Sequence, residues 1–452
     1  TWGWCGRMSS QADWRQCLDE YEKLVIRLNT PRVVIDNVVC SAATVIKVDG
    51  GRKHGILLDA VQVLTDLNLI IKKAYISSDG RWFMDVFHVT DQNGDKLTDE
   101  SVTSCIEQSL GSIHYVRSSD FEGTTALELT GTDRLGLLSE VFAVLSELQC
   151  SVVQAKAWTH NGRIASLLYI KDCISGSAIE DPQKINRIEG RLRNVLRGVN
   201  DIQSAKISVS MAATHIDRRL HQLMYDDRDY ELEPIIQTGS DAPVVTVHHW
   251  AGRDYSVVNV QCKDREKLLF DVICNLTDMQ YVVFHATINT MKDKAYMEFY
   301  IRHTDGAPIN FEAERQRVSL CLQAAIERRT SEGVLLELRT PDRDGLLAHV
   351  TRTFRENGLN VMRAEITTTS DAAQNNFYVS DMVGKCADPE IIESVRRRIG
   401  EKSLLVKEVP SRCEEKGERG MAGYVAGGAA WMSIGSLVKR NLYNLGLIRS
   451  YS

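Results

Sequence analysis

Hydrophobic residues along the chain switch between two spacings, and the switches follow a fixed order. Alternation at every second residue predicts a strand, whereas apolar residues at i, i+3 and i+4 predict an amphipathic helix. The clearest copy has strand, helix, strand, strand, helix and strand at 125–130, 137–148, 151–159, 163–171, 182–196 and 205–209. The turn His160-Asn161-Gly162 joins its two middle strands as a hairpin. We therefore predict a β-α-β-β-α-β unit.

Units with this order recur along the chain, which is typical of an array. We predict an N-terminal extension with a short helix, a first and a second unit, a linker, a third and a fourth unit, and a Gly-rich tail, at 1–30, 31–119, 120–211, 212–242, 243–330, 331–410 and 411–452. Gly55 and Gly136 are 81 residues apart and Lys267 and Gly345 are 78 apart, while the two pairs are offset by 212 and 209 residues. This spacing indicates a duplicated pair. It favours packing of the first unit beside the second and of the third beside the fourth.

The first and third units each follow a strand-like segment that begins with proline, at Pro31 and Pro243. The third unit has no sequence for a final strand, because its second helix runs almost directly into Val334. We therefore predict that residues 243–249 fill the sheet edge that the final strand would otherwise occupy.

The β-α-β-β-α-β order predicts a ferredoxin-like α+β fold, in which two helices cover one face of a sheet. The loop after the first strand is Asp133-Arg134-Leu135-Gly136 in the second unit and Asp342-Arg343-Asp344-Gly345 in the fourth. It leads into a helix, whose free N–H groups and dipole suit an anion, and its glycine permits close approach to the main chain. Arginine suits a carboxylate and aspartate suits an ammonium group. The motif therefore matches the two charges of a free amino acid.

The predicted ligand-binding residues are Asp133, Arg134, Gly136, Leu137, Asp342, Arg343, Gly345 and Leu346. Asp264, Arg265 and Gly55 are weaker candidates. The third unit has Lys267 in place of the glycine, and the first has Gly51-Arg52 in place of Asp-Arg. A structural interpretation stays open for every copy: aspartate caps the helix, arginine is an exposed turn residue, and the leucines are core.

Composition and motifs limit the classes of function that remain for the chain. The net charge of −6 and the scattered basic residues do not indicate nucleic-acid binding, and the 11 cysteines, without a C-x-x-C pair, favour reduced thiols. No phosphate-binding loop, nucleophile elbow or dinucleotide fingerprint occurs. His248-His249 on a strand would point to opposite faces, and Asp226, Asp227 and Asp229 are predicted to form a solvated linker. We predict no catalytic residue, no metal and no cofactor.

Several sequence stretches carry a resemblance to a known family: Cys17-Leu-Asp-Glu-Tyr-Glu-Lys-Leu24, Pro31-Arg-Val-Val-Ile-Asp-Asn37, Thr130-Gly-Thr-Asp-Arg-Leu-Gly-Leu-Leu138, Pro341-Asp-Arg-Asp-Gly-Leu-Leu347 and Asn444-Leu-Gly-Leu-Ile-Arg-Ser-Tyr-Ser452. The repeated units resemble ACT domains, and four of them in one chain resemble the plant ACT domain repeat (ACR) family. The resemblance implies a regulatory protein that binds a free amino acid and has no catalytic activity of its own. It also implies side-by-side pairing of modules with ligands at their interface, which a partner protein or enzyme then reads as an allosteric signal.

The alternative function is a scaffold that binds a partner protein without any small ligand; an unrecognised enzyme is a third hypothesis, for which no nucleophile or metal cluster stands out. We expect a cytoplasmic protein, with the nucleus as the other location, and a homo-oligomer is compatible with this function. Residues 420–438 carry no charge but include five glycines, so we expect no stable membrane span.

Overall fold

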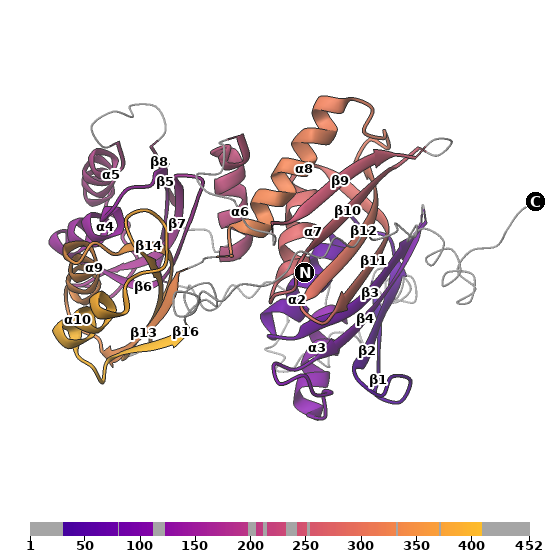
Figure 1. Ribbon diagram of the computed structural model, residues 1–452, viewed down its shortest axis with the longest axis horizontal. Helices are drawn as coiled ribbons and strands as arrows, with labels where there is room; N and C mark the ends of the chain where they lie inside the picture. The colour runs from indigo at the N-terminus through magenta and orange to yellow at the C-terminus, as the bar shows by residue number, and fades with distance from the viewer. Residues whose placement is uncertain are drawn as a thin grey trace, which may run out of the picture. The chain divides into compact units, whose positions relative to one another are not determined.

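The computed structural model describes residues 30–79, 81–111, 123–197, 205–210, 215–231, 242–250, 254–330, 333–369 and 372–408. Residues 1–29 of the N-terminal extension, where a short helix is predicted, and the tail at 411–452 lie outside these residues. Every described strand belongs to one of two eight-stranded antiparallel sheets (Figure 1).

Sheet A joins the first and third units. Its strands, in spatial order, are β1 (Arg32–Asp36), β2 (Thr44–Gly51), β4 (Trp82–Thr90), β3 (Ile70–Ser78), β11 (Tyr281–Met291), β12 (Lys294–His303), β10 (Ser256–Lys263) and β9 (Val244–His249). The units meet where β3 pairs with β11, with Ala74 opposite Ile288. One face packs on α2 (Ile56–Asp66), α3 (Glu100–Gly111), α7 (Leu268–Asp278) and α8 (Glu312–Glu327).

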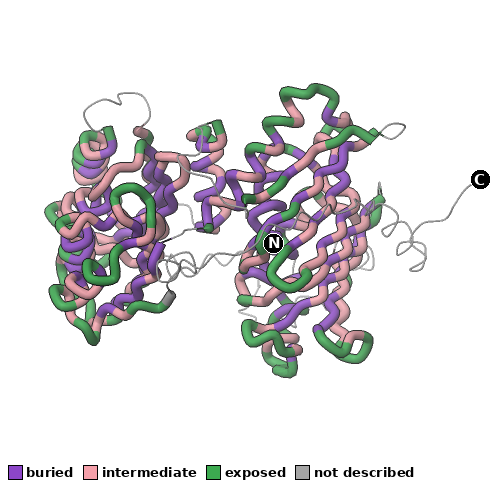
Figure 2. The backbone as a smooth tube through the Cα atoms, in the orientation of Figure 1, coloured by how far each residue is buried: buried purple, intermediate pink, exposed green. Residues whose placement is uncertain are grey.

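Sheet B joins the second and fourth units. Its strands, in spatial order, are β16 (Leu404–Glu408), β13 (Val334–Pro341), β15 (Ala372–Ser380), β14 (Asn360–Thr369), β6 (Cys150–His160), β7 (Arg163–Asp172), β5 (Thr125–Thr132) and β8 (Lys206–Ser210). The units meet where β14 pairs with β6, with Ala364 opposite Ala157. One face packs on α4 (Leu137–Glu147), α5 (Pro182–Arg197), α9 (Leu346–Glu356) and α10 (Pro389–Ile399). Figure 2 shows buried backbone along the strands and inner helix faces.

The predicted α+β fold and the arrangement in two pairs are confirmed, but the predicted partners are wrong. The first unit pairs with the third and the second with the fourth. The sequence offsets record duplication, whereas pairing depends on which free strand edges meet. Loop-closure entropy rises only with the logarithm of loop length, so a pairing across a longer stretch of chain costs little more.

The prediction that residues 243–249 fill a sheet edge is confirmed, and the strand after Pro31 does the same in the first unit. β9 pairs with β10, with Val247 opposite Val258, and β1 pairs with β2, with Ile35 opposite Ile46. In sheet B the equivalent edge positions are taken by the final strands β8 and β16. An upstream strand therefore completes each unit of sheet A in the way that a downstream strand completes each unit of sheet B.

The linker contains a helix, α6 (Ile216–Asp226), followed by the short 3-10 helix η3 (Asp229–Glu231). The second face of sheet B packs against α6 through the buried residues Ala126, Trp158, Ala165, Leu167, Tyr169, Ile216, Leu220, Leu223 and Met224. The prediction of a solvated acidic linker is wrong for Asp227, whose side chain is 7% exposed and pairs with Arg163, and for Asp229. The side chain of Asp229 is fully buried, with Arg328 Nη2 2.7 Å from its Oδ1.

The remaining predictions on reactive groups have mixed outcomes. His248 and His249 are exposed on β9, and the described residues contain no group of three side chains suited to hold a metal ion. Seven described cysteines are free thiols, but Cys386 forms a disulfide, so the expectation of reduced thiols is wrong there. No helix within the described ranges is long and apolar enough to cross a membrane.

Candidate functional site

The β5–α4 loop turns sharply at Gly136, which has a φ of 79° and lies at the N-cap of α4. The main chain of the loop is fixed on both sides, since Asp133 N–H donates to Gly162 O at 2.8 Å and Leu137 N–H donates to Arg134 O at 3.1 Å. No side chain caps α4. The structural interpretation of Asp133 as a helix cap is therefore wrong, and its carboxylate is free for another role.

Asp133 lies in a small cavity between the second and fourth units. The cavity is lined by Asp133, Arg134, Gly136, Leu137, Leu138, Ser139, Thr351, Leu359, Asn360 and Val361. Asn360 Nδ2 donates to Asp133 Oδ2 at 3.4 Å. Burial raises the pKa of Asp133 to about 6, although the hydrogen bond from Asn360 and the charge of Arg134 act in the opposite direction. The volume is about 10 Å³, room for about one water molecule.

Arg134 does not point its charge at an open site. Its guanidinium binds both carboxylate oxygens of Glu140, at 2.9 and 2.6 Å, and donates to Val195 O on α5 at 3.1 Å. Arg355 Nη1 lies 3.8 Å from the same carboxylate. The charge expected to pair with a ligand carboxylate is therefore already balanced, and Arg134 instead fastens the start of α4 to α5.

Gly136 also serves a close approach between helices. A Cβ atom at this position would lie 2.1 Å from Arg355 Cδ on α9, so the Arg355 side chain would have to move. Its positive φ disfavours a side chain independently. The glycine leaves space at the main chain as predicted, but in this structure Arg355 of the fourth unit occupies that space.

The β13–α9 loop has the same backbone turn, with Gly345 at a φ of 73° as the N-cap of α9. Its Asp342, Arg343 and Asp344 are all exposed. Ser151 of the second unit is the equivalent of Asn360 in the fourth. Ser151 lies 15 residues after Gly136, and Asn360 lies 15 residues after Gly345. Ser151 Oγ donates to Lys171 O at 3.5 Å. The two predicted loops are therefore alike in backbone and different in surroundings.

The loops of the first and third units use other side chains. Gly55 has a φ of 84°, and Arg52 lies with its guanidinium carbon 4.4 Å from the centre of the Phe284 ring. Asp264 is half-buried, and Arg265 Nη1 is 2.7 Å from Asp271 Oδ2. Of the weaker candidates, Arg265 therefore forms an ion pair within its own unit, and Gly55 provides the same left-handed turn as Gly136.

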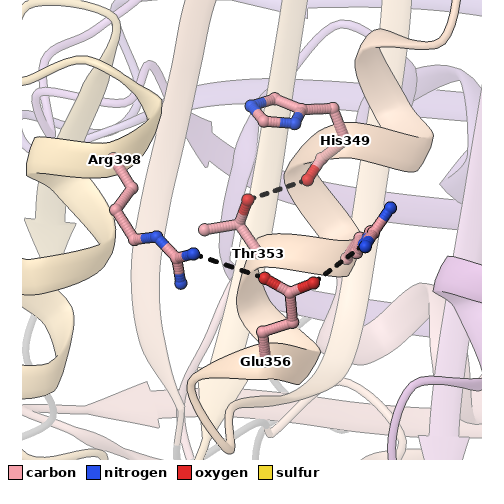
Figure 3. Close-up of a pocket in the computed structure, with 5 residues that line it drawn as sticks. His349, Thr353, Glu356 and Arg398 are labelled. Carbon is pink, nitrogen blue, oxygen red and sulfur yellow. Dashed lines mark hydrogen bonds and ion pairs between the residues drawn. The ribbon is translucent and has the colours of Figure 1, made fainter.

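A larger hollow of about 290 Å³ lies on the helix face of the fourth unit, lined by His349, Arg352, Thr353, Glu356 and Arg398 (Figure 3). Arg352 Nε donates to Glu356 at 2.8 Å, and Arg398 approaches the same carboxylate at 3.4 Å. The second unit has the equivalent pair, Arg191 with Glu147 at 2.6 Å. The recurrence indicates an ion pair that joins two helices, so we do not take this hollow as the ligand site.

Sequence analysis missed the residues that the fourth unit contributes to the cavity of Asp133. Asn360 and Thr351 lie more than 200 residues from the loop they face. Glu140, which neutralises Arg134, lies one turn into α4, and its acidic side chain close to the loop in sequence is the signal that could have found it. No pattern in the sequence points to Asn360, because it meets Asp133 only when the second and fourth units pair.

Comparisons with known proteins agree with the fold. The model of the ACR family N-terminal ACT domain matches residues 39–117, and the ACT domain model matches residues 334–401. The ACT domain-containing protein ACR8 of Arabidopsis thaliana is 63% identical over 437 residues, which is 96% of this chain and 99% of the relative. ACR4 of the same plant is 51% identical, covering 96% and 98% of the two chains, and ACR5 is 50% identical, covering 96% and 97%.

Proposed function

Because this chain belongs to the ACR family of ACT domain-containing proteins, we propose that it is a non-catalytic amino-acid sensor whose ligand binds at the β5–α4 loop. One observation carries the choice of loop. Asp133 is a carboxylate at the interface of two units, where an amide of the opposite unit, Asn360, donates a hydrogen bond to it. An ammonium group suits such a carboxylate, because ionised hydrogen bonds are the strong ones in a site shielded from water.

The ligand carboxylate would meet the start of α4. Its first-turn N–H groups have no side-chain cap, and the positive end of the helix dipole lies there. Arg134 contributes indirectly, by holding α4 in place through Glu140 and Val195. Apolar specificity would come from Leu137, Leu359 and Val361, which line the same cavity.

Binding must change the structure, because the cavity of about 10 Å³ is far too small for an amino acid. The loop, or the start of β14 that carries Asn360, has to move outward. Since α4 and α9 pack against each other across the same interface, this movement alters how the second and fourth units meet. A partner protein or enzyme in the cytoplasm then distinguishes the two arrangements, and the ligand shifts their balance by its difference in affinity for them.

The test is a thermal-shift screen of the free amino acids on the full chain, followed by calorimetry. A ligand that binds only the folded state raises the unfolding temperature with concentration. We expect Asp133→Asn to abolish the heat of binding and Asp342→Asn to leave it unchanged. Saturable binding that survives Asp133→Asn would refute this site.

The ligand-independent scaffold makes the opposite prediction. No amino acid would raise the unfolding temperature, and a partner would bind equally well to the wild type and to Asp133→Asn. The screen therefore separates the two functions before any partner is known.

A further inference from the structure

Lys267 stands where the other three units have glycine. It is the N-cap of α7 and has a φ of 61°, while Gly55, Gly136 and Gly345 have the same left-handed turn at the other helix starts. This backbone conformation is unfavourable for a residue with a side chain. Lysine therefore costs backbone energy here that glycine would not, and the contacts of its side chain decide what offsets this cost.

The ammonium group of Lys267 pairs with the linker helix. Its Nζ lies 3.1 Å from Oδ2 of Asp217, in the first turn of α6. Asp217 is only 2% exposed, so its carboxylate needs charged partners in place of water. Burial alone would raise the pKa of Asp217, but Arg329, Lys156 and Lys267 hold it well below its usual range.

The three cations that surround Asp217 come from different parts of the chain. Lys156 Nζ, on β6 of sheet B, is 2.6 Å from Oδ1. Arg329 Nη2, just beyond α8 of sheet A, is 3.0 Å from Oδ2. Lys267 belongs to the loop before α7, also of sheet A. One carboxylate of the linker therefore holds groups from both sheets.

Further contacts surround Asp217 and its three cations. Arg329 Nε binds Asp271 of α7 at 2.8 Å, and His221 of α6 lies 2.7 Å from the same carboxylate. Arg329 also lies over the Trp158 ring of β6, 4.5 Å from its centre. Trp158 therefore contacts both the ion pairs, through Arg329, and α6, which covers it on sheet B.

We infer that the β10–α7 loop is a lock rather than an amino-acid site: Lys267 holds Asp217, and Asp217 fixes α6 to both sheets at once. Lys267 is the most exposed of the three cations, at 25% of its side chain, and Arg329 holds the same carboxylate from sheet A beside it. The lock does not depend on ligand binding at the β5–α4 loop, so either proposal can fail alone.

The experiment compares Lys267→Gly with Lys292→Gly in the full chain without ligand. Lys292 is also a lysine at positive φ, 58°, but it is exposed in the β11–β12 turn. Glycine relieves the same backbone strain at both positions. Amide hydrogen exchange, read by mass spectrometry, measures local opening of Ile216–Asp226, with Pro389–Ile399 as the internal reference.

We expect Lys267→Gly to speed exchange in α6 about tenfold and to leave α10 unchanged, while Lys292→Gly changes neither. Lys267→Met, which keeps the strained backbone and the apolar stem, should speed exchange as well, and Lys267→Arg should restore the wild-type rate. If Lys267→Gly and Lys267→Met both exchange like the wild type, the lock is refuted. Equal acceleration in α6 and α10 would also refute it, because the substitution would then act on the whole fold.

Discussion

The β5–α4 and β13–α9 loops have nearly the same sequence and the same glycine turn, yet only the first has a neighbour that completes it. Asp133 meets Asn360 across the unit interface, whereas Asp342 is exposed and the equivalent residue, Ser151, binds within its own unit. Gly136 lies under Arg355, whereas Gly345 faces the small Ser146. The motif therefore specifies a turn, and the residues of the opposite unit determine whether the turn becomes a site.

The largest difference between the loops should appear in stability. Gly136→Ala adds a Cβ that collides with Arg355 in addition to the unfavourable φ, so we expect a loss of about 3 kcal/mol in the free energy of unfolding. Gly345→Ala has only the unfavourable φ and an ordinary contact with Ser146, so about 1 kcal/mol is expected. Chemical denaturation of both variants measures this. The second change Arg355→Ala should recover part of the loss for Gly136→Ala and nothing for Gly345→Ala.

The pH dependence of ligand binding should also separate the loops. Asp133 has a pKa raised to about 6, so acid neutralises the charge that would hold an ammonium group. We expect amino-acid affinity to fall about tenfold between about pH 7 and about pH 5. Calorimetry at several pH values, with each proposed ligand, gives the profile. Asp342→Asn should keep this profile, and a profile unchanged from pH 7 to pH 5 in the wild type would contradict the role of Asp133.

The stability of the ligand-free protein should show the opposite trend at this residue. Because the folded pKa of Asp133 lies above its usual value of 3.8, the folded state binds the proton more tightly. Its contribution to stability is complete below about pH 4 and is lost as the pH rises through about 6. Urea unfolding at several pH values should therefore show a steeper loss in the wild type than in Asp133→Asn.

A smaller effect is expected at the amide that faces Asp133. Asn360→Ala removes the hydrogen bond but leaves the carboxylate, so we expect amino-acid affinity to change by about fivefold. The matched variant Ser151→Ala, in the equivalent place of the second unit, should not change the affinity. Equal effects of the two variants would show that the asymmetry between the loops is not functional.

The smallest difference concerns the two arginines. Arg134→Ala breaks a two-pronged pair with Glu140 that is about one-third exposed, so a loss of about 1 kcal/mol is expected. Arg343 is exposed, and Arg343→Ala should be close to neutral in the free energy of unfolding. Thermal unfolding of the two variants side by side is sufficient to decide this.

Local sequence patterns were sufficient for most of the fold. The helix predicted at 137–148 is α4, at Leu137–Glu147, and the edge strand predicted at 243–249 is β9, at Val244–His249. Both follow from hydrophobic spacing and the missing final strand, which are properties of one unit. The partner of each unit did not follow, because free edges of similar strands compete and the sequence offset does not choose between them.

The dependence on partner residues also explains which residues of the candidate site the sequence predicts. Asp133, Gly136 and Leu137 are predicted from the loop alone, and they line one cavity. Arg134 is in the loop, but Glu140, six residues further on, balances its charge. The acidic neighbours of Asp229 predict a solvated residue, whereas Arg328, about 100 residues away, buries it. Charged partners, near or far in the sequence, therefore account for both differences between prediction and structure.

The exchange of partners between the two halves has a consequence for synthesis of the chain. When the ribosome has finished the second unit, β3 and β6 both present bare edges, since β11 and β14 do not yet exist. Unpaired edges invite association with other strands, including each other. Native pairing of the first half therefore needs the second, and two separately expressed halves, 1–211 and 212–410, should find each other and assemble as one protein.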